Sequence, residues 1–107
     1  MDPGLVFKAL GDPTRSAIFS SLLERKHCMR SLSLKLGVSE SAISQHMKLL
    51  RGADLVYGER FGHHVHYLPN HETLEELHAY CASLVSASLN LDRNTKTCNC
   101  AYRMSDK

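Results

Sequence analysis

Apolar and polar positions between residues 30 and 51 follow a pattern that predicts two short helices joined by a tight turn. In the second helix, Ile43, Met47 and Leu50 recur at spacings i, i+4 and i+7, so they share one face. The opposite face carries small polar and basic side chains, namely Ser41, Ser44, Gln45 and Lys48. His46 falls on the flank of the apolar face and is expected to lie nearer to packing. A helix divided in this way can pack on one side and enter a DNA major groove on the other.

The helix before the turn has a mixed pattern. Residues 31–36 alternate between polar and apolar with a period of two, which is typical of a strand. Met29, Leu32 and Leu36 also fit a helical repeat, and Gly37 can adopt the left-handed conformation that ends a helix. We favour the helix because the neighbouring elements require one. The resulting order is helix, turn, helix.

Two further helices are predicted before this unit. Residues 3–10 form a short apolar helix. Asp12 followed by Pro13 indicates the start of another, because aspartate caps free backbone N–H groups and proline suits the first helical position. The buried stripe of this second helix is expected to comprise Ile18, Phe19, Leu22 and Leu23.

A β-hairpin is predicted after the polar helix. Residues 55–60 and 64–68 are typical of strands, with residues 61–63 as the turn. A hairpin directly after a helix-turn-helix is the plan of a winged helix, whose hairpin tip touches the DNA backbone or the minor groove. Further candidate DNA contacts, at the end of the polar helix and near this tip, are Arg51, Arg60, His63 and His64.

The last predicted helix runs from about residue 70 to residue 90 and carries a repeating stripe of mostly apolar residues. The stripe comprises Leu74, Leu77, Cys81, Leu84, Ser88 and Leu91. Such a stripe packs against another helix, most simply that of a second copy of the chain. The predicted fold is therefore mainly α with a small β-hairpin, a winged helix-turn-helix of order α-α-α-α-β-β-α that forms a homodimer through its last helix. Residues 1–91 would form this domain, and residues 92–107 a flexible, cysteine-containing tail.

Composition and charge favour one small domain with a nucleic-acid partner. A chain of 107 residues buries only a modest core, and its 43% hydrophobic content favours completion of that core by dimerisation. The net charge is only +2, but basic residues dominate residues 25–51, whereas Glu72, Glu75 and Glu76 crowd into one turn. We therefore expect one face to meet phosphate, with double-stranded operator DNA as the partner.

The sequence shows no signal for a membrane or for secretion. No apolar run approaches the roughly 18 residues of a transmembrane span, so no membrane partner is expected. The first residues lack the basic start and apolar core of a signal peptide. The four cysteines are then expected to be reduced thiols in the cytoplasm.

Taken together, these segments resemble a known family. ALGDPTRSAIFSSLLE, SLKLGVSESAISQHMKLLRGADLV and a hairpin ending in HVHYL are similar to the ArsR/SmtB group of bacterial winged-helix repressors, over about residues 5 to 90. The resemblance implies a homodimer built on the first and last helices. It further implies autogenous repression of a small operon, released when an inducer binds, often a metal or metalloid ion. It also implies DNA contacts at Ser41, Ser44, Gln45, His46 and Lys48.

The family's metal-binding positions are only partly matched. Its arsenic, cadmium and lead sensors often carry Cys-x-Cys where this chain has residues 27–30, HCMR, so only Cys28 is present. The four ligand positions of its zinc and cobalt sensors fall on Asn70, Glu72, Ser83 and Ser86. The later pair offers no ligand, which argues against a site of that type.

The cysteines supply the best candidate for an inducer site. Cys98 and Cys100 lie one residue apart, so their two thiolates can bind one soft ion. A third thiolate, from Cys28, Cys81 or a partner subunit, would suit As(III), and a fourth ligand could suit Zn(II) or Cd(II). Cys28 has basic neighbours that favour its thiolate, whereas Cys81 is more simply a small apolar residue of the dimer stripe. His78 could join a metal site but is more simply a half-exposed helix residue.

The predicted function is a DNA-binding transcriptional regulator, a repressor that leaves a palindromic operator when As(III), Cd(II) or Zn(II) binds its cysteine thiolates. A thiol-redox or sulfide-responsive repressor of the same fold is one alternative, and a winged-helix module that binds a protein is another. An enzyme with Cys28 as nucleophile is not favoured, because the adjacent His27 points elsewhere and the sequence has no Gly-rich loop or acid–base pair.

Overall fold

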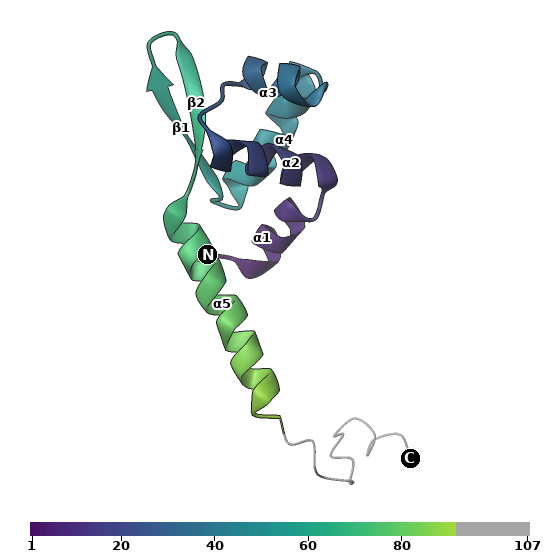
Figure 1. Cartoon of the computed structure of the whole chain (residues 1–107), viewed down its shortest axis with the longest axis vertical. Coiled ribbons are helices and arrows are strands. Elements are labelled where there is room, and N and C mark those ends of the chain that lie inside the picture. The colour runs from purple at the N-terminus through teal and green to yellow at the C-terminus, as the bar shows by residue number, and fades with distance from the viewer. Residues whose placement is uncertain (92–107) are drawn as a thin grey trace.

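Four short helices and a hairpin form the body of the molecule, and one longer helix projects from it (Figure 1). The computed structural model describes residues 1–91. The elements are α1 (Pro3–Leu10), α2 (Pro13–Glu24), α3 (Met29–Leu36), α4 (Glu40–Gly52), β1 (Val56–Phe61), β2 (His64–Pro69) and α5 (His71–Leu89). The predicted α-α-α-α-β-β-α order is confirmed.

The first two helices begin at Asp-Pro pairs, as the sequence predicts for the second. Asp2 Oδ1 accepts a hydrogen bond from the backbone N–H of Leu5 (3.2 Å), and Asp12 Oδ2 accepts one from that of Arg15 (3.0 Å). Each bond satisfies a backbone donor that the helix itself leaves free. The proline after each aspartate has no N–H to satisfy at the first helical position.

Residues 31–36, whose alternation is typical of a strand, lie in helix α3. Gly37 ends α3 with φ of 68°, in the left-handed region that favours glycine. Ser39 then caps α4 by accepting from the backbone N–H of Ala42 (3.1 Å). The strand-like alternation of the sequence does not correspond to one buried face, because Leu32 is buried whereas Leu34, two residues on, is 74% exposed.

The core lies where α1 to α4 meet the base of the hairpin. Ile43, Met47 and Leu50 are fully buried, which confirms the predicted packing face of α4. The buried stripe of α2 is partly wrong, because Ile18, Phe19 and Leu22 are buried but Leu23 is 56% exposed. Leu23 follows Leu22 by about 100° around the helix, so it turns away from the core. The remaining buried apolar residues are Val6, Ala9, Leu32, Ala53, Leu55, Val56 and Tyr67.

The predicted hairpin is present, but each strand ends one residue later than expected. Phe61 pairs with His64, so the loop contains only Gly62 and His63. Gly62 has φ of 63°, which the first position of a tight two-residue loop requires. Leu55 lies before β1 and is held by backbone bonds from its N–H to the carbonyl of Leu50 and from the N–H of Asn70 to its carbonyl.

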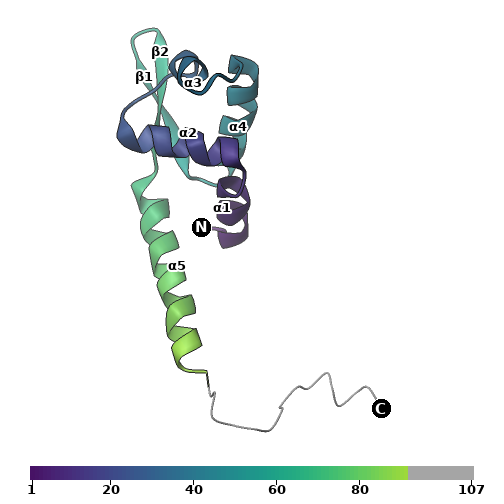
Figure 2. The ribbon, with the colours of Figure 1, turned by 45° about the vertical axis from the view of Figure 1, so that its right-hand side comes forward.

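Helix α5 contacts the body through its first half and extends away from it beyond that (Figure 2). Thr73 Oγ1 donates to the carbonyl of Asp54 (2.6 Å), and Leu74 and Leu77 pack against the core. Farther along the predicted stripe, Leu84 and Leu91 are 49% and 63% exposed in the single chain. The homodimer that would cover them stays a prediction. None of the helices within residues 1–91 has the length and apolar character that crossing a membrane requires.

Candidate nucleic-acid interface

The outer face of α4 presents a continuous set of polar side chains. The exposed members are Ser41, Ser44, Gln45, Lys48 and Arg51. A shallow hollow of about 270 Å³ lies along this face, and Met29 of α3 forms part of its wall. The division into buried and exposed positions that the sequence predicts for this helix is therefore present.

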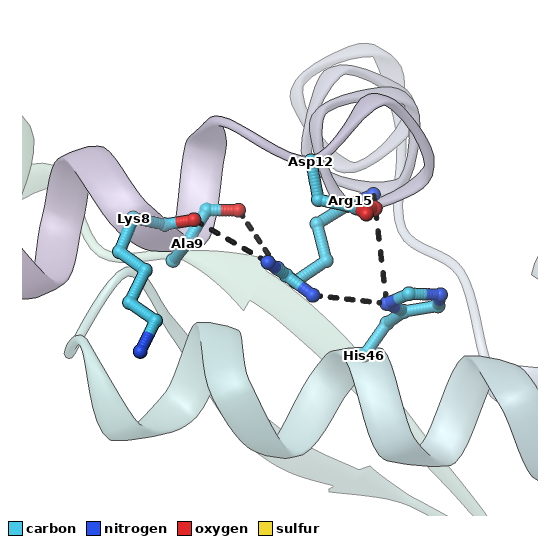
Figure 3. A network of polar contacts seen from close by, with 5 residues as sticks. All are labelled: Lys8, Ala9, Asp12, Arg15 and His46. Atoms are coloured by element: carbon cyan, nitrogen blue, oxygen red, sulfur yellow. Dashed lines mark hydrogen bonds and ion pairs between the residues drawn. The ribbon is translucent and has the colours of Figure 1, made fainter.

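His46 lies differently from the other candidates on α4. Its ring is turned toward the start of α2, where Nδ1 lies 3.3 Å from Arg15 Nη1 and 4.0 Å from Asp12 Oδ2 (Figure 3). The side chain is only 24% exposed. This position agrees with the expectation that His46 lies nearer to packing than to base reading, and a direct DNA contact by its ring stays a prediction.

The hairpin supplies a second group of exposed side chains. Arg60, His63 and His64 are exposed at and beside its tip. In both ribbon views this tip and the turn between α3 and α4 lie at the same end of the molecule, away from the free end of α5 (Figures 1 and 2). A hollow of about 360 Å³ between α4 and the hairpin is lined by both Arg51 and Arg60. The structure thus brings together two basic residues that the sequence places on separate elements.

The basic side chains of this surface are available to an anionic partner. Within residues 1–91, Lys48, Arg51 and Arg60 form no ion pair with a carboxylate. Lys35 is different, since its Nζ lies 2.7 Å from Glu24 Oε1 and its hydrogen bond lowers the pKa of that carboxyl. Unpaired cations beside a polar helix face are suited to phosphate oxygens.

The hairpin is held against the body by contacts that sequence reasoning missed. Lys26 Nζ lies 4.2 Å from the centre of the Phe61 ring, a cation–π contact, and Phe61 stacks on His66 at 4.8 Å. His27 is buried, and its backbone carbonyl accepts from the N–H of Tyr67 (3.0 Å). These contacts join the α2–α3 connection to the wing. Residue spacing carries no signal for the contacts of Lys26 and His27, because their partners in the hairpin lie 35 and 40 positions away.

The ring of His27 is enclosed in the protein. Its Nδ1 shares a hydrogen bond with Ser31 Oγ, while Nε2 is buried without a partner in the described part of the chain. Burial lowers the pKa of His27, because an enclosed imidazolium loses its hydration; the positive charge of Arg25 acts in the same direction. The sequence alone gives His27 no role beyond its position next to Cys28.

The cysteine candidates are not gathered into a metal site within residues 1–91. Cys28 is the half-buried N-cap residue of α3, and Cys81 is half-buried on α5. His78 is exposed on the same helix as Cys81. No group of three or more potential ligands of the His, Cys, Asp or Glu type occurs in this part of the chain. Cys98 and Cys100 lie outside the described residues, so the predicted thiolate site stays a prediction.

A helix-turn-helix followed by a wing, with an exposed polar second helix, defines a winged helix-turn-helix protein. A family model described as bacterial regulatory protein, arsR family, matches residues 12–57. The transcriptional repressor SdpR of Bacillus subtilis is 30% identical over 71 residues, which cover 66% of this chain and 79% of SdpR. The chain belongs to the arsR family of bacterial regulatory proteins, and the resemblance seen in the sequence is confirmed.

Two further similarities extend this assignment. The transcriptional repressor SmtB of Mycobacterium tuberculosis (strain H37Rv) is 41% identical over 64 residues, or 60% of this chain and 47% of SmtB. The chain spans about half the length of the SmtB proteins that it matches. A crystal structure of a possible transcriptional regulator for arsenical resistance matches with a TM-score of 0.66 and 27% identity, over 78% of this chain and 84% of that one.

Proposed function

We propose that the chain is a transcriptional repressor that binds double-stranded operator DNA as a homodimer. The observation that carries the proposal is the exposed polar face of α4, which lies at the same end of the molecule as the arginine-bearing wing. A protein of this function is not an enzyme, and it acts in the cytoplasm, where bacterial DNA is found.

The roles of the side chains follow from their chemistry. Gln45 has an amide that can bond the N6 and N7 edge of an adenine, and Ser41 or Ser44 can bond a base edge or a phosphate. Lys48 is suited to a phosphate or a guanine. Arg51 and Arg60 line one hollow, so together they can hold the backbone beside the groove that α4 enters.

Dimerisation would pair two such surfaces. The exposed leucines of α5, together with Leu5 and Phe7 of α1 at 47% and 46% exposure, form apolar surface that a second copy could cover. Two-fold symmetry would place the two recognition helices, α4 of each copy, about one DNA turn apart on a palindromic site.

We further propose that a thiophilic ion or a thiol oxidant acts as the inducer. Similarity to a possible regulator for arsenical resistance supports an ion such as As(III), with Cd(II) and Zn(II) as alternatives. Residues 1–91 alone do not supply a complete ligand set. Such a site would need Cys98 and Cys100, with Cys28 or a partner subunit adding a third thiolate. Oxidation of a cysteine pair is the alternative signal.

The first prediction concerns Gln45. Replacing it with alanine removes one bidentate base contact, so affinity for the operator duplex should fall about 5- to 150-fold while the chain stays folded and self-associated. Fluorescence anisotropy with a labelled duplex, selected from a random library by the wild type, measures the change. Ser20→Ala, on the exposed outer side of α2, is the control and should bind as the wild type does.

Three outcomes separate the proposals. Equal affinity of Gln45→Ala and wild type would show that α4 does not read the bases. Failure of the wild type to bind any duplex at low salt would favour a protein partner for the same surface. On operator DNA, release by As(III), Cd(II) or Zn(II) under reducing conditions indicates an ion inducer, whereas reductant-reversible release by an oxidant indicates redox sensing.

A further inference from the structure

One arginine side chain connects three segments of the body. Arg15 Nε donates to the carbonyl of Ala9 (2.9 Å), and Nη2 donates to that of Lys8 (3.3 Å), both in the last turn of α1. The remaining terminal nitrogen, Nη1, points at His46 Nδ1 of α4 at 3.3 Å (Figure 3). The backbone N–H of Arg15 is itself bonded to Asp12. Arg15 therefore links α1 to the recognition helix from a fixed position at the start of α2.

The hydrogen bond from Arg15 determines which nitrogen of the His46 ring carries the proton. A guanidinium has only donors, so His46 Nδ1 must act as the acceptor and carry no proton. The ring is then neutral, with its proton on Nε2.

The link lies beside a hollow between α1 and α4. A hollow of about 90 Å³ separates the two helices and is lined by Leu5, Lys8, Ala9, Arg15 and Leu49. The apolar contact between them is therefore incomplete at this point. Arg15 forms part of the wall of this hollow, beside its bonds to Lys8 and Ala9.

We propose that Arg15 is a positioning residue that holds α4, the recognition helix, against α1 through its hydrogen bond to the His46 ring. The inference rests on the proposed DNA-binding function and on the role of α1 in the dimer, because the link then couples dimer geometry to the helix that enters the groove. The charged groups beside the His46 ring are Asp12 and Arg15 of the α2 start; from α1, Lys8 contributes its carbonyl to the link.

The first test needs no DNA. In ¹⁵N-detected spectra above neutral pH, the His46 ring should show an unprotonated Nδ1 and a protonated Nε2. Arg15→Gln should remove this preference for one tautomer, because the donor that enforces it is gone. A wild-type ring with its proton on Nδ1 would overturn the inference, and so would a ring that Arg15→Gln leaves unchanged.

The second test measures affinity for the operator duplex at pH 8. Arg15→Gln and His46→Phe should each weaken binding about fivefold, the scale of one hydrogen bond, and the double variant should be no weaker than either single one. His46→Gln keeps an acceptor and should stay within about twofold of the wild type. Lys8→Gln removes a neighbouring charge but keeps the carbonyl, and should bind as the wild type does.

Rescue by a second acceptor separates positioning from simple loss of structure. His46→Gln restores an acceptor for the Arg15 guanidinium and His46→Phe does not, so only His46→Phe should lose affinity. If Arg15→Gln is unfolded in a thermal scan, the comparison of His46→Phe with His46→Gln carries the same test.

Two results of the binding measurements would also overturn the inference. One is a loss with His46→Phe but not with Arg15→Gln, which would mean that the ring touches DNA directly. The other is additive losses in the double variant. If the wild type binds no duplex, the proposed function fails, and the ring-nitrogen measurement still decides whether Arg15 holds His46.

Discussion

At the scale of single residues, the chain places histidines in very different surroundings. His63, His64 and His71 are exposed, whereas His27 is 2% exposed. Its ring shares a hydrogen bond with Ser31 of α3, and its backbone carbonyl accepts from Tyr67 of β2. Burial lowers the pKa of His27, so the folded protein keeps this ring neutral at a pH where the unfolded chain would protonate it. The stability of the fold is therefore linked to pH through one side chain.

The sign of this linkage gives a prediction. As pH falls through the ordinary histidine value of 6.5, the unfolded chain gains a proton that the folded chain refuses, so the melting temperature should drop. His27→Gln should cost about 1 kcal/mol at pH 8, through the lost bond to Ser31, but should flatten the dependence between pH 7.5 and 5.5. Calorimetry across this range measures both effects. His71→Gln should retain the wild-type slope, and an unchanged slope in His27→Gln would refute the linkage.

At the scale of elements, the turn between α3 and α4 sets how the recognition helix is presented. Gly37 adopts φ of 68°, and no atom lies within 4 Å of the position that its Cβ would take. The requirement for glycine is therefore one of backbone conformation and not of space. Gly52, at the end of α4, also has open space around it, but its φ is ordinary.

These two glycines form a matched pair. Gly37→Val should lower the free energy of unfolding by about 1–2 kcal/mol, the cost of a left-handed conformation for a residue with Cβ. Gly52→Ala should be neutral or stabilising by up to about 1 kcal/mol, because alanine favours a helix more than glycine does. Urea unfolding measures both. Equal effects at the two positions would mean that the turn does not depend on the left-handed glycine.

Local patterns predicted the elements better than they predicted the contacts between them. The caps at Asp12 and the apolar repeat of α4 depend on neighbours along the chain, so sequence was sufficient for them. The period-two alternation of residues 31–36 was ambiguous, and packing of Leu32 decided it. The link from Arg15 to His46 spans 31 positions and the pairing of His27 with Tyr67 spans 40, so tertiary packing alone creates them.

At the scale of the whole molecule, the single chain leaves much apolar surface uncovered. Leu84, Val85 and Leu89 of α5 are 49%, 59% and 78% exposed. Phe7 and Tyr80 approach each other at 6.1 Å, so the exposed surface of α1 adjoins that of α5. Continuous apolar surface over both helices is what a two-fold partner would bury.

A charge placed on this surface tests the dimer. Leu84→Glu should weaken self-association more than about tenfold, since a buried carboxylate would lose its hydration, and should weaken duplex binding in parallel. Ser86→Glu introduces the same charge on the face shared with Glu75 and should leave self-association unchanged. Sedimentation equilibrium compares the two variants. A dimer that tolerates Leu84→Glu as well as Ser86→Glu would place the interface elsewhere.

The hydrogen bond from Thr73 to the carbonyl of Asp54 makes α5 a lever. It fixes Thr73, near the start of α5, directly after the end of α4, and the helix from Thr73 to Leu89 extends about 24 Å from that point. A rotation of about 10° at this pivot displaces the far end by about 4 Å over that length. In a dimer held by the far ends of α5, a small sliding of the paired α5 helices would change the orientation of both α4 helices relative to each other. Discrimination between half-site spacings would then be set by the stiffness of this joint.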